Sequence, residues 1–357
     1  MWLGSVITAS MNPSEDLLTV TTEGLHCPLG DFTIDPWRPV PRAVITHAHA
    51  DHARAGSGSY LALADGLTVL RARLGESAVI QTVQPGEQVR MGPVTVSLHP
   101  AGHIIGSAQV RVEHRGRVWV ASGDYKTTAD PTCQPFEPVR CHTFITECTF
   151  GMPVYRWPEP ELVRRQILEW WHRCAAEGRV AVLLGYALGK AQRLLAGLVD
   201  GPGPIVEHGA THKLTRAYRE AGVSLPNTRS VAEGVPEGGW KGALVLAPPS
   251  AQGTPWLNRF GEVSTAFASG WMMLRGTRRR GAADRGFVVS DHADWPGLLG
   301  AIEATGATTV LATHGSTAIL TRYLRERGLD ARALSTPWEG ERADANASTE
   351  DAIGEAE

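Results

Sequence analysis

The residues best suited to chemistry lie in one short segment, residues 46–52, whose sequence is Thr-His-Ala-His-Ala-Asp-His. It continues the apolar stretch Ala43–Thr46, which we expect to be a strand. Imidazole and carboxylate groups suit Zn²⁺, Mn²⁺ or Fe²⁺ rather than Ca²⁺ or Mg²⁺ alone. A single histidine is usually structural, but four potential ligands in this order favour a metal centre over a solvated turn: His47, His49, Asp51 and His52.

Three further candidate ligands each follow a predicted strand and adjoin a glycine, which lets backbone segments approach closely. Active sites on sheets commonly draw residues from several strand ends. His103 follows strand 94–98, Asp124 follows strand 117–121, and His314 follows strand 309–312.

Six donors and a shared carboxylate fit two metals about 3.5–4 Å apart. We assign His47, His49 and His103 to the first metal, Asp51, His52 and His314 to the second, and Asp124 as the bridge. A water between the ions would lose a proton near neutral pH and become the nucleophile. The hypothesis is a two-metal hydrolase that uses Zn or Mn, in which Asp51 serves catalysis as well as metal binding.

Two more residues are candidates for proton transfer. His292 lies in Ser-Asp-His-Ala-Asp at 290–294, where carboxylates can orient its ring, and Glu147 ends strand 143–146. We expect His292 to protonate the leaving oxygen and Glu147 to hold His292 in position. The alternatives are a histidine at a helix start before Trp295 and a buried glutamate in an ion pair.

Composition indicates a globular chain. Its 357 residues, 43% hydrophobic and 20% charged, suffice for about two domains. No apolar run approaches the roughly 20 residues of a membrane span, and a secretory signal pattern is not evident. Five cysteines without a Cys-x-x-Cys pair favour reduced thiols. We therefore expect a cytoplasmic protein with no membrane association.

The sequence pattern changes near Pro158. Before it, short alternating strands predict a sheet-rich body, and after it strands and helices alternate. Short buried strands resume at 287–290 and 309–313, with helices at 295–304 and 317–327. We divide the chain into 1–157, the first part of the body; 158–285, an α/β insertion; 286–337, the closing part of the body; and 338–357, a disordered tail with seven acids and one arginine.

These motifs resemble the metallo-β-lactamase superfamily, in its nuclease branch with a β-CASP-like insertion. The segment 47–52 looks like the signature loop, and His103 and Asp124 match the next two ligand motifs. Glu147 looks like the acidic motif that opens the β-CASP segment, residues 187–192 resemble a segment recurrent within it, and His292 and His314 match the closing histidine motifs. Cys148 stands where a serine is expected, a mild departure.

Further motifs at 24–28, 34–39, 285–287 and 290–295 are similar to those of the bacterial ligase-associated DNA exonucleases. The resemblance covers about residues 17–335. It implies an α/β protein with a four-layer αββα metallo-β-lactamase fold and an inserted α/β (β-CASP-like) domain. It also implies an exonuclease that digests single-stranded DNA from the 5′ end in DNA repair, with a DNA ligase and other repair proteins as partners.

The residues themselves select a substrate less sharply. A basic run that leads towards His292 can track phosphates, or else it is a solvated loop: Arg275, Arg278, Arg279, Arg280 and Arg285. Lys126 and Lys190 are expected to contact phosphate. Four aromatic residues are candidates for stacking on bases, or else core residues: Tyr155, Trp157, Tyr186 and Trp271.

Three alternatives stay open. The first is an RNA-processing nuclease of the same branch, and the second is a small-molecule metallo-hydrolase, favoured if the insertion is a closed lid without a basic groove. The third is a binding subunit without catalysis. The complete set of predicted ligands argues against this last alternative.

Overall fold

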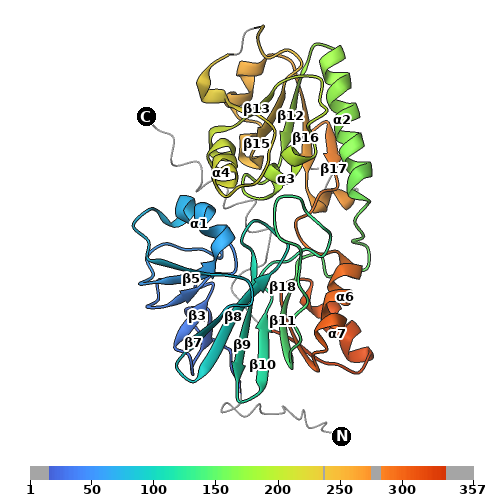
Figure 1. Cartoon of the computed structure of the whole chain (residues 1–357). Helices are drawn as coiled ribbons and strands as arrows, with labels where there is room; N and C mark the ends of the chain where they lie inside the picture. Colours follow the sequence, from blue (N-terminus) through green and yellow to red (C-terminus); the bar gives the residue numbers. More distant parts are fainter. Residues whose placement is uncertain (1–15, 236–237, 275–282, 335–357) are drawn as a thin grey trace, which may run out of the picture.

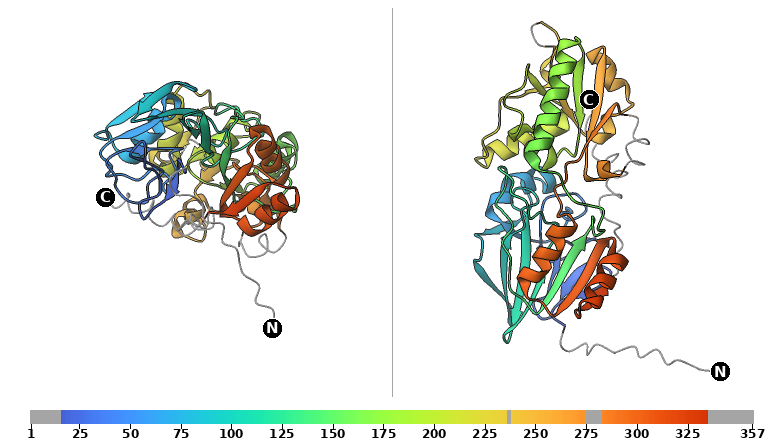
Figure 2. Two further views of the ribbon diagram at one scale, coloured as in Figure 1. Left: turned by 90° about the horizontal axis from the view of Figure 1, so that it is seen from below. Right: turned by 90° about the vertical axis from the view of Figure 1, so that its right-hand side faces the viewer.

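The computed structural model describes residues 16–235, 238–274 and 283–334, which contain three β-sheets. Sheets A and B form one end of the molecule, and sheet C with its helices forms the other (Figures 1 and 2). Sheet A has the order β1 (Thr19–Val20), β2 (Leu25–Cys27), β3 (Phe32–Ile34), β4 (Ala43–Val44), β5 (Tyr60–Leu63) and β6 (Ile80–Val83). Sheet B has the order β19 (Asp330–Ala333), β18 (Thr309–Gly315), β11 (Thr143–Cys148), β10 (Arg117–Ala121), β9 (Ala108–His114), β8 (Val94–Pro100) and β7 (Gln88–Met91).

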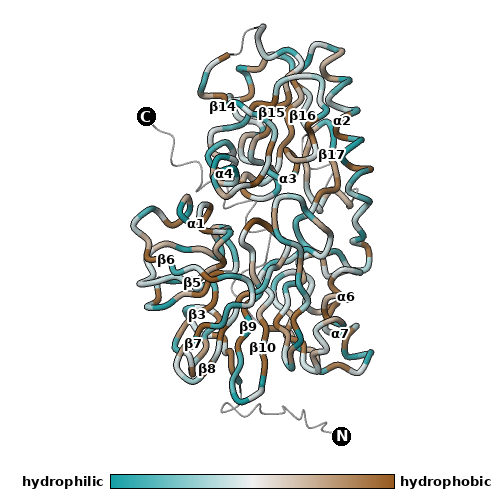
Figure 3. Tube along the Cα trace, in the orientation of Figure 1, coloured by the Kyte–Doolittle hydropathy of each residue, from teal (hydrophilic) through white to brown (hydrophobic). Residues whose placement is uncertain are grey.

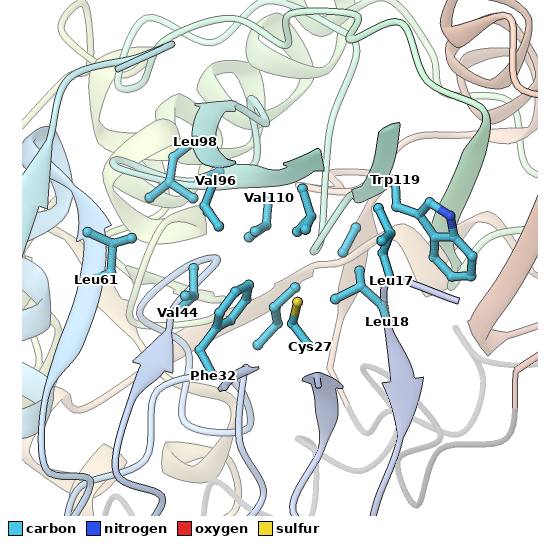
Figure 4. Packing of buried hydrophobic residues seen from close by; sticks show 14 of the residues in the cluster. Leu17, Leu18, Cys27, Phe32, Val44, Leu61, Val96, Leu98, Val110 and Trp119 are labelled. Atoms are coloured by element: carbon cyan, nitrogen blue, oxygen red, sulfur yellow. The ribbon is translucent and has the colours of Figure 1, made fainter. Parts of the chain in front are cut away.

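Sheets A and B pack face to face through their apolar faces. Figure 4 shows Phe32 and Val44 of sheet A opposite Val96 and Val110 of sheet B. Helix α1 (Leu67–Leu74) covers the outer face of sheet A, and α6 (Trp295–Thr305) and α7 (Thr317–Glu326) cover that of sheet B. The layers therefore run helix, sheet, sheet, helix. Within the described residues, no helix has the length and apolar character needed to cross a bilayer.

Sheet C belongs to residues 160–287, which we call the α/β unit. Its strands are all parallel. The central strands are apolar (Figure 3) because both faces of the sheet are covered, one by α-helices and the other by short 3-10 helices and loops. Their order is β14 (Arg229–Ser230), β13 (Ile205–Glu207), β15 (Leu244–Ala247), β12 (Val180–Leu184), β16 (Val263–Ala268) and β17 (Arg285–Phe287). The helices are α2 (Pro160–Ala176), α3 (Lys190–Ala196) and α4 (Gly209–Glu220). The unit also has four short 3-10 helices: η2 (Val231–Glu233), η3 (Pro249–Ala251), η4 (Pro255–Phe260) and η5 (Gly270–Met273). Another 3-10 helix, η1 (Ala64–Gly66), lies outside the unit, directly before α1.

The predicted strand at 287–290 needs correction. The strand is β17, which ends at Phe287 and pairs with β16 of sheet C rather than with the body. The predicted boundary after residue 285 thus falls within a strand. A short apolar run has no periodicity that could assign it to one sheet or the other.

Strand direction brings the candidate residues together. In sheet B, β8, β10, β11 and β18 all run the same way, since β9 is antiparallel to β8 and β10 and the others are parallel. Their carboxyl ends therefore meet at one edge of the sheet. The segments at or after these ends carry His103, Asp124, Glu147 and His314.

The loop that carries His103 passes so close to η1 that Gly106 has no room for a side chain. A Cβ there would lie 2.2 Å from the Gly66 Cα, and φ is +69°. We expect Gly106→Ala to lower the free energy of unfolding by more than about 1 kcal/mol, measured by urea denaturation. Gly116→Ala is the matched control, because its φ is +78° and nothing lies within 4 Å. Equal losses in the two variants would contradict the close-packing argument.

Candidate metal centre

Three imidazoles converge on one point. The His49 Nδ1 atom lies 3.0 Å from His47 Nε2 and 3.1 Å from His103 Nε2. An ion bound at 2.0–2.1 Å by several such nitrogens would hold them about 3.3 Å apart. The spacing therefore fits a single metal ion between the three rings. His47 and His49 come from the loop after β4, and His103 comes from the segment after β8.

The second nitrogen of each ring is held by a partner, which fixes the tautomer. His103 Nδ1 donates to the Asp291 carbonyl at 2.7 Å, and His49 Nε2 donates to the Leu188 carbonyl at 3.2 Å. His47 Nδ1 donates to the Thr46 hydroxyl at 3.0 Å. Each ring therefore turns an unprotonated nitrogen towards the common point.

Asp124 lies between this group and a second one. Its Oδ2 atom is 3.6 Å from His47 Nε2, 3.9 Å from His103 Nε2 and 3.5 Å from His52 Nε2. Asp51 Oδ2 is 3.3 Å from the same His52 nitrogen. This placement suits a carboxylate that bridges two cations.

His314 is further from the centre than the other predicted ligands. Its ring centroid lies 6.1 Å from that of His52, and both residues line a cavity of about 70 Å³ together with Asp51. Its φ is +55°, an uncommon backbone conformation that turns the chain at the end of β18. Among the described residues, the largest group of potential ligands with atoms within 4.8 Å of one another is His47, His49, His103 and Asp124.

Burial controls protonation of the first group. Burial, together with the neighbouring His103, lowers the pKa of His49 to about 4, and burial with the neighbouring His292 lowers the pKa of His103 to about 4. For Asp124, burial alone would raise the pKa, but His52 and His292 outweigh it and keep it well below its usual range. Neutral imidazoles and an ionised carboxylate are the forms that bind metals.

The pKa of His52 is shifted in the opposite direction. Burial would lower its pKa, but Asp51, Asp124 and Asp35 surround it and raise its pKa well above the ordinary value. Protonation of His52 is therefore favoured in the metal-free protein, and a cation at the second site competes with that proton.

We expect the two metals to be released at different pH values. Protons compete with the first metal only near about pH 4, because the pKa values of His49 and His103 lie there instead of at 6.5. Binding of the second metal releases the His52 proton, so its affinity falls first on acidification. Between pH 6.5 and about 4, the folded metal-free protein also binds fewer protons at His49 and His103 than the unfolded chain does. Acidification through this window therefore lowers the free energy of unfolding.

Equilibrium dialysis across that window, with bound metal measured at each pH, tests this prediction. Release of both ions together near pH 6.5 would contradict it.

Glu147 and His292 form the predicted pair. His292 Nδ1 lies 2.8 Å from Glu147 Oε1, and the carboxylate also accepts the backbone N–H of Tyr125 at 3.0 Å. Glu147 is 1% exposed. One atom each of Asp124, Glu147 and His292 lie within 4.8 Å of one another, so this pair adjoins the metal ligands. A bulge between Glu147 and Cys148 in the β11–β18 pairing turns the strand end here.

Asp35 is a site residue to which the sequence analysis gave no role. Its Oδ2 atom accepts from His52 Nδ1 at 2.7 Å and from the Thr46 hydroxyl at 2.5 Å, and its Oδ1 accepts the Thr46 N–H at 2.8 Å. It thus orients both His52 and, through Thr46, His47. The available signal was a carboxylate at a strand end, just before Pro36, within one of the family-like motifs.

Two predicted phosphate contacts need correction. Lys126 and Lys190 are 1% and 0% exposed. The Lys126 Nζ lies 2.6 Å from Asp130, and the Lys190 Nζ lies 3.5 Å from Asp291. A phosphate would have to displace these buried partners, so both lysines are internal ion-pair residues. The other predicted contacts, Arg278, Arg279 and Arg280, lie outside the described residues, as do Arg275 and the tail 338–357.

The candidate stacking residues pack mainly on one another. Tyr155, Trp157 and Trp271 surround Phe150 with ring centroids 4.8–4.9 Å away, and Tyr155 is fully buried. The Trp157 indole N–H donates to the His292 carbonyl at 2.9 Å. Three of the four aromatics thus support the loop of His292. The fourth, Tyr186, lies under the Lys190 ammonium.

Comparison with known proteins finds relatives that are longer than the region they share with this chain. No protein-family model matches the chain. It is 34% identical over 316 residues to a probable DNA ligase of Opitutus terrae, covering 88% of this chain and 30% of that protein. It is 28% identical over 219 residues to a ribonuclease of Thermus thermophilus, covering 54% and 47%, and 29% identical over 119 residues to an endoribonuclease of Saccharomyces cerevisiae, covering 32% and 15%. The chain thus spans less than half the length of each.

A solved structure shares the fold. It is a protein of unknown function from Enterococcus faecalis V583, with a TM-score of 0.55 at 13% identity over 84% of this chain and 80% of that one. At this identity the likeness concerns the fold alone. The mixed α/β architecture with several sheets fits a metallo-β-lactamase-type fold.

Proposed function

From relatives that point to the metallo-β-lactamase/β-CASP nuclease superfamily, we propose that this chain is a two-metal exonuclease that hydrolyses phosphodiester bonds of single-stranded DNA. The observation that carries the proposal is Asp124, whose one oxygen lies between two histidine groups beside the Glu147–His292 pair. Such a site combines a place for two cations with a proton donor. The α/β unit would be the β-CASP-like insertion.

In the proposed mechanism, His47, His49 and His103 would hold the first ion, Asp51, His52 and His314 would hold the second, and Asp124 would contribute to both sites. Bound divalent ions, Zn or Mn, would supply positive charge to the phosphate and lower the pKa of an attacking water. His292 gives a proton to the leaving oxygen through Nε2, because its Nδ1 is held by Glu147. Glu147 keeps the ring in this orientation and stabilises its charged form.

The extent of the matches to relatives supports DNA over RNA. The relative named a DNA ligase matches 88% of this chain, whereas the relatives named ribonucleases match 29–54% of it. The match to part of a ligase also supports action in DNA repair beside a DNA ligase and other repair proteins in the cytoplasm. The names of the other relatives favour the second candidate, an RNA-processing ribonuclease.

The test uses single-stranded DNA and RNA of one sequence, labelled at the 5′ or the 3′ end, with metal-free protein reconstituted with Zn²⁺ or Mn²⁺. We expect mononucleotides released from the 5′ end of DNA. Preferential cleavage of RNA would select the second candidate, and cleavage of neither polymer would contradict both nuclease assignments.

A further inference from the structure

We propose that helix α3 of the α/β unit positions the histidines of the first metal, with Lys190 and Arg193 acting through Asp291. The inference rests on the proposed function in one respect, the metal held by His47, His49 and His103. It gives the two basic residues of α3 a role other than contact with phosphate.

The first link joins α3 to Asp291. Arg193 Nη1 lies 3.3 Å from Asp291 Oδ1, and Lys190 Nζ lies 3.5 Å from Oδ2, so two cations of one helical face share one carboxylate. Arg193 also donates to the Ser290 carbonyl. Asp291 is 3% exposed. A carboxylate this deeply buried is costly unless it is paired, so these cations allow Asp291 to occupy its position.

The second link joins Asp291 to the metal site. Its backbone carbonyl accepts the Nδ1–H of His103 at 2.7 Å. This hydrogen bond directs His103 Nε2 towards His49 and His47. Asp291 therefore links α3 to a metal ligand. The α/β unit holds its side chain, and its backbone carbonyl holds the imidazole of His103.

The segment before α3 contacts a second histidine of the first metal site, His49. The Leu188 carbonyl accepts from His49 Nε2 at 3.2 Å. Gly189 next to it has φ +88°, and a Cβ there would lie 2.2 Å from the Ile104 side chain, beside His103. The Tyr218 hydroxyl of α4 accepts the N–H of Ile105 at 3.2 Å. Two of the three first-metal histidines thus take their orientation from contacts that the α/β unit makes or holds in place.

Partners of this kind control metal affinity, because they fix the ring orientation and the tautomer of a ligand. Their loss typically weakens metal binding or activity roughly 10- to 100-fold. Without Arg193, Asp291 keeps a single cation, and the 290–292 backbone loses the contact that holds the Ser290 carbonyl. The His103 ring is then free to turn away from the common point.

The experiment compares Arg193→Ala, Arg193→Lys and the control Arg322→Ala in the full chain. Arg322 belongs to α7 and pairs with Glu326 at the surface. Zn²⁺ and Mn²⁺ dissociation constants come from competition with a chromophoric chelator, and kcat and KM on single-stranded DNA are measured at saturating metal. We expect Arg193→Ala to raise the metal Kd about 10- to 100-fold with KM unchanged. Arg193→Lys should recover most of the affinity, and Arg322→Ala should leave the metal Kd unchanged.

Other outcomes would overturn the inference. An unchanged metal Kd with a raised KM would make Arg193 a substrate contact. If Arg193→Ala does not fold, Gly189→Ala tests the other contact of the α/β unit with the first metal site, the Leu188 carbonyl on His49, by pushing the segment before α3 away from Ile104. An unchanged metal Kd in that variant overturns the inference. A wild-type chain that binds no metal would overturn the proposed function and this inference with it, whereas unchanged variants beside a metal-binding wild type overturn the inference alone.

Discussion

Replacing Asp124 by alanine should lower hydrolysis by about 10³-fold or more and reduce the bound metal from two ions per chain to one or none. The reason is that one oxygen of this carboxylate faces both histidine groups. Loss of one ion removes several kcal/mol of charge stabilisation in the transition state, and each 1.4 kcal/mol is about tenfold in rate. Single-turnover assays together with metal analysis of the purified variant measure both effects.

Asp124→Ala also separates metal binding from folding. Asp124 helps to keep the proton on His52, so its removal should lower the pKa of His52 without opening the core. Asp330→Ala, which removes an exposed carboxylate paired with Arg332, is the control and should retain full activity. Normal hydrolysis by Asp124→Ala with two ions bound would show that another residue bridges them.

The strands that precede the ligands were predictable because they are apolar runs with clear ends. The prediction of β10 at Arg117–Ala121 is confirmed to the residue, and the predicted helices at 295–304 and 317–327 correspond to α6 and α7 to within one residue. The segment from β5 to β7, which includes α1, was not predicted. Its strands have four residues each, and α1 has no strong amphipathic pattern to distinguish it from a loop.

The candidate ligands could be found from the sequence because each is an unusual residue type at a strand end. The groups that orient them could not. Leu188 and Asp291 act through backbone carbonyls, which every residue has, so residue type carries no signal for them. Lys190 was assigned to phosphate because a basic residue at a helix start favours anions, whereas its buried partner lies about one hundred residues later in the chain.

Replacing His292 by alanine should slow hydrolysis of DNA about 10²- to 10⁴-fold, the usual contribution of a general acid, while two metal ions stay bound. Its ring is held by Glu147 at 2.8 Å and lies beside Asp124, outside the group formed by the three first-metal histidines and Asp124. Glu147→Gln should give a smaller loss, because the ring stays in place while its charged form loses a partner. His99→Ala is the control, since that ring bonds to Ser97 and Glu137 instead.

The chemistry of the leaving group decides whether His292 acts as an acid. The nitrophenolate group of a nitrophenyl phosphodiester leaves without needing a proton. His292→Ala should therefore hydrolyse this substrate nearly as fast as the wild type does, although it cuts DNA slowly. The wild-type rate on DNA should fall at high pH as the acid loses its proton, and this alkaline limb should disappear in the variant. Equal losses on both substrates, or loss of a metal ion, would assign His292 to the metal site, and the proton would have to come from solvent.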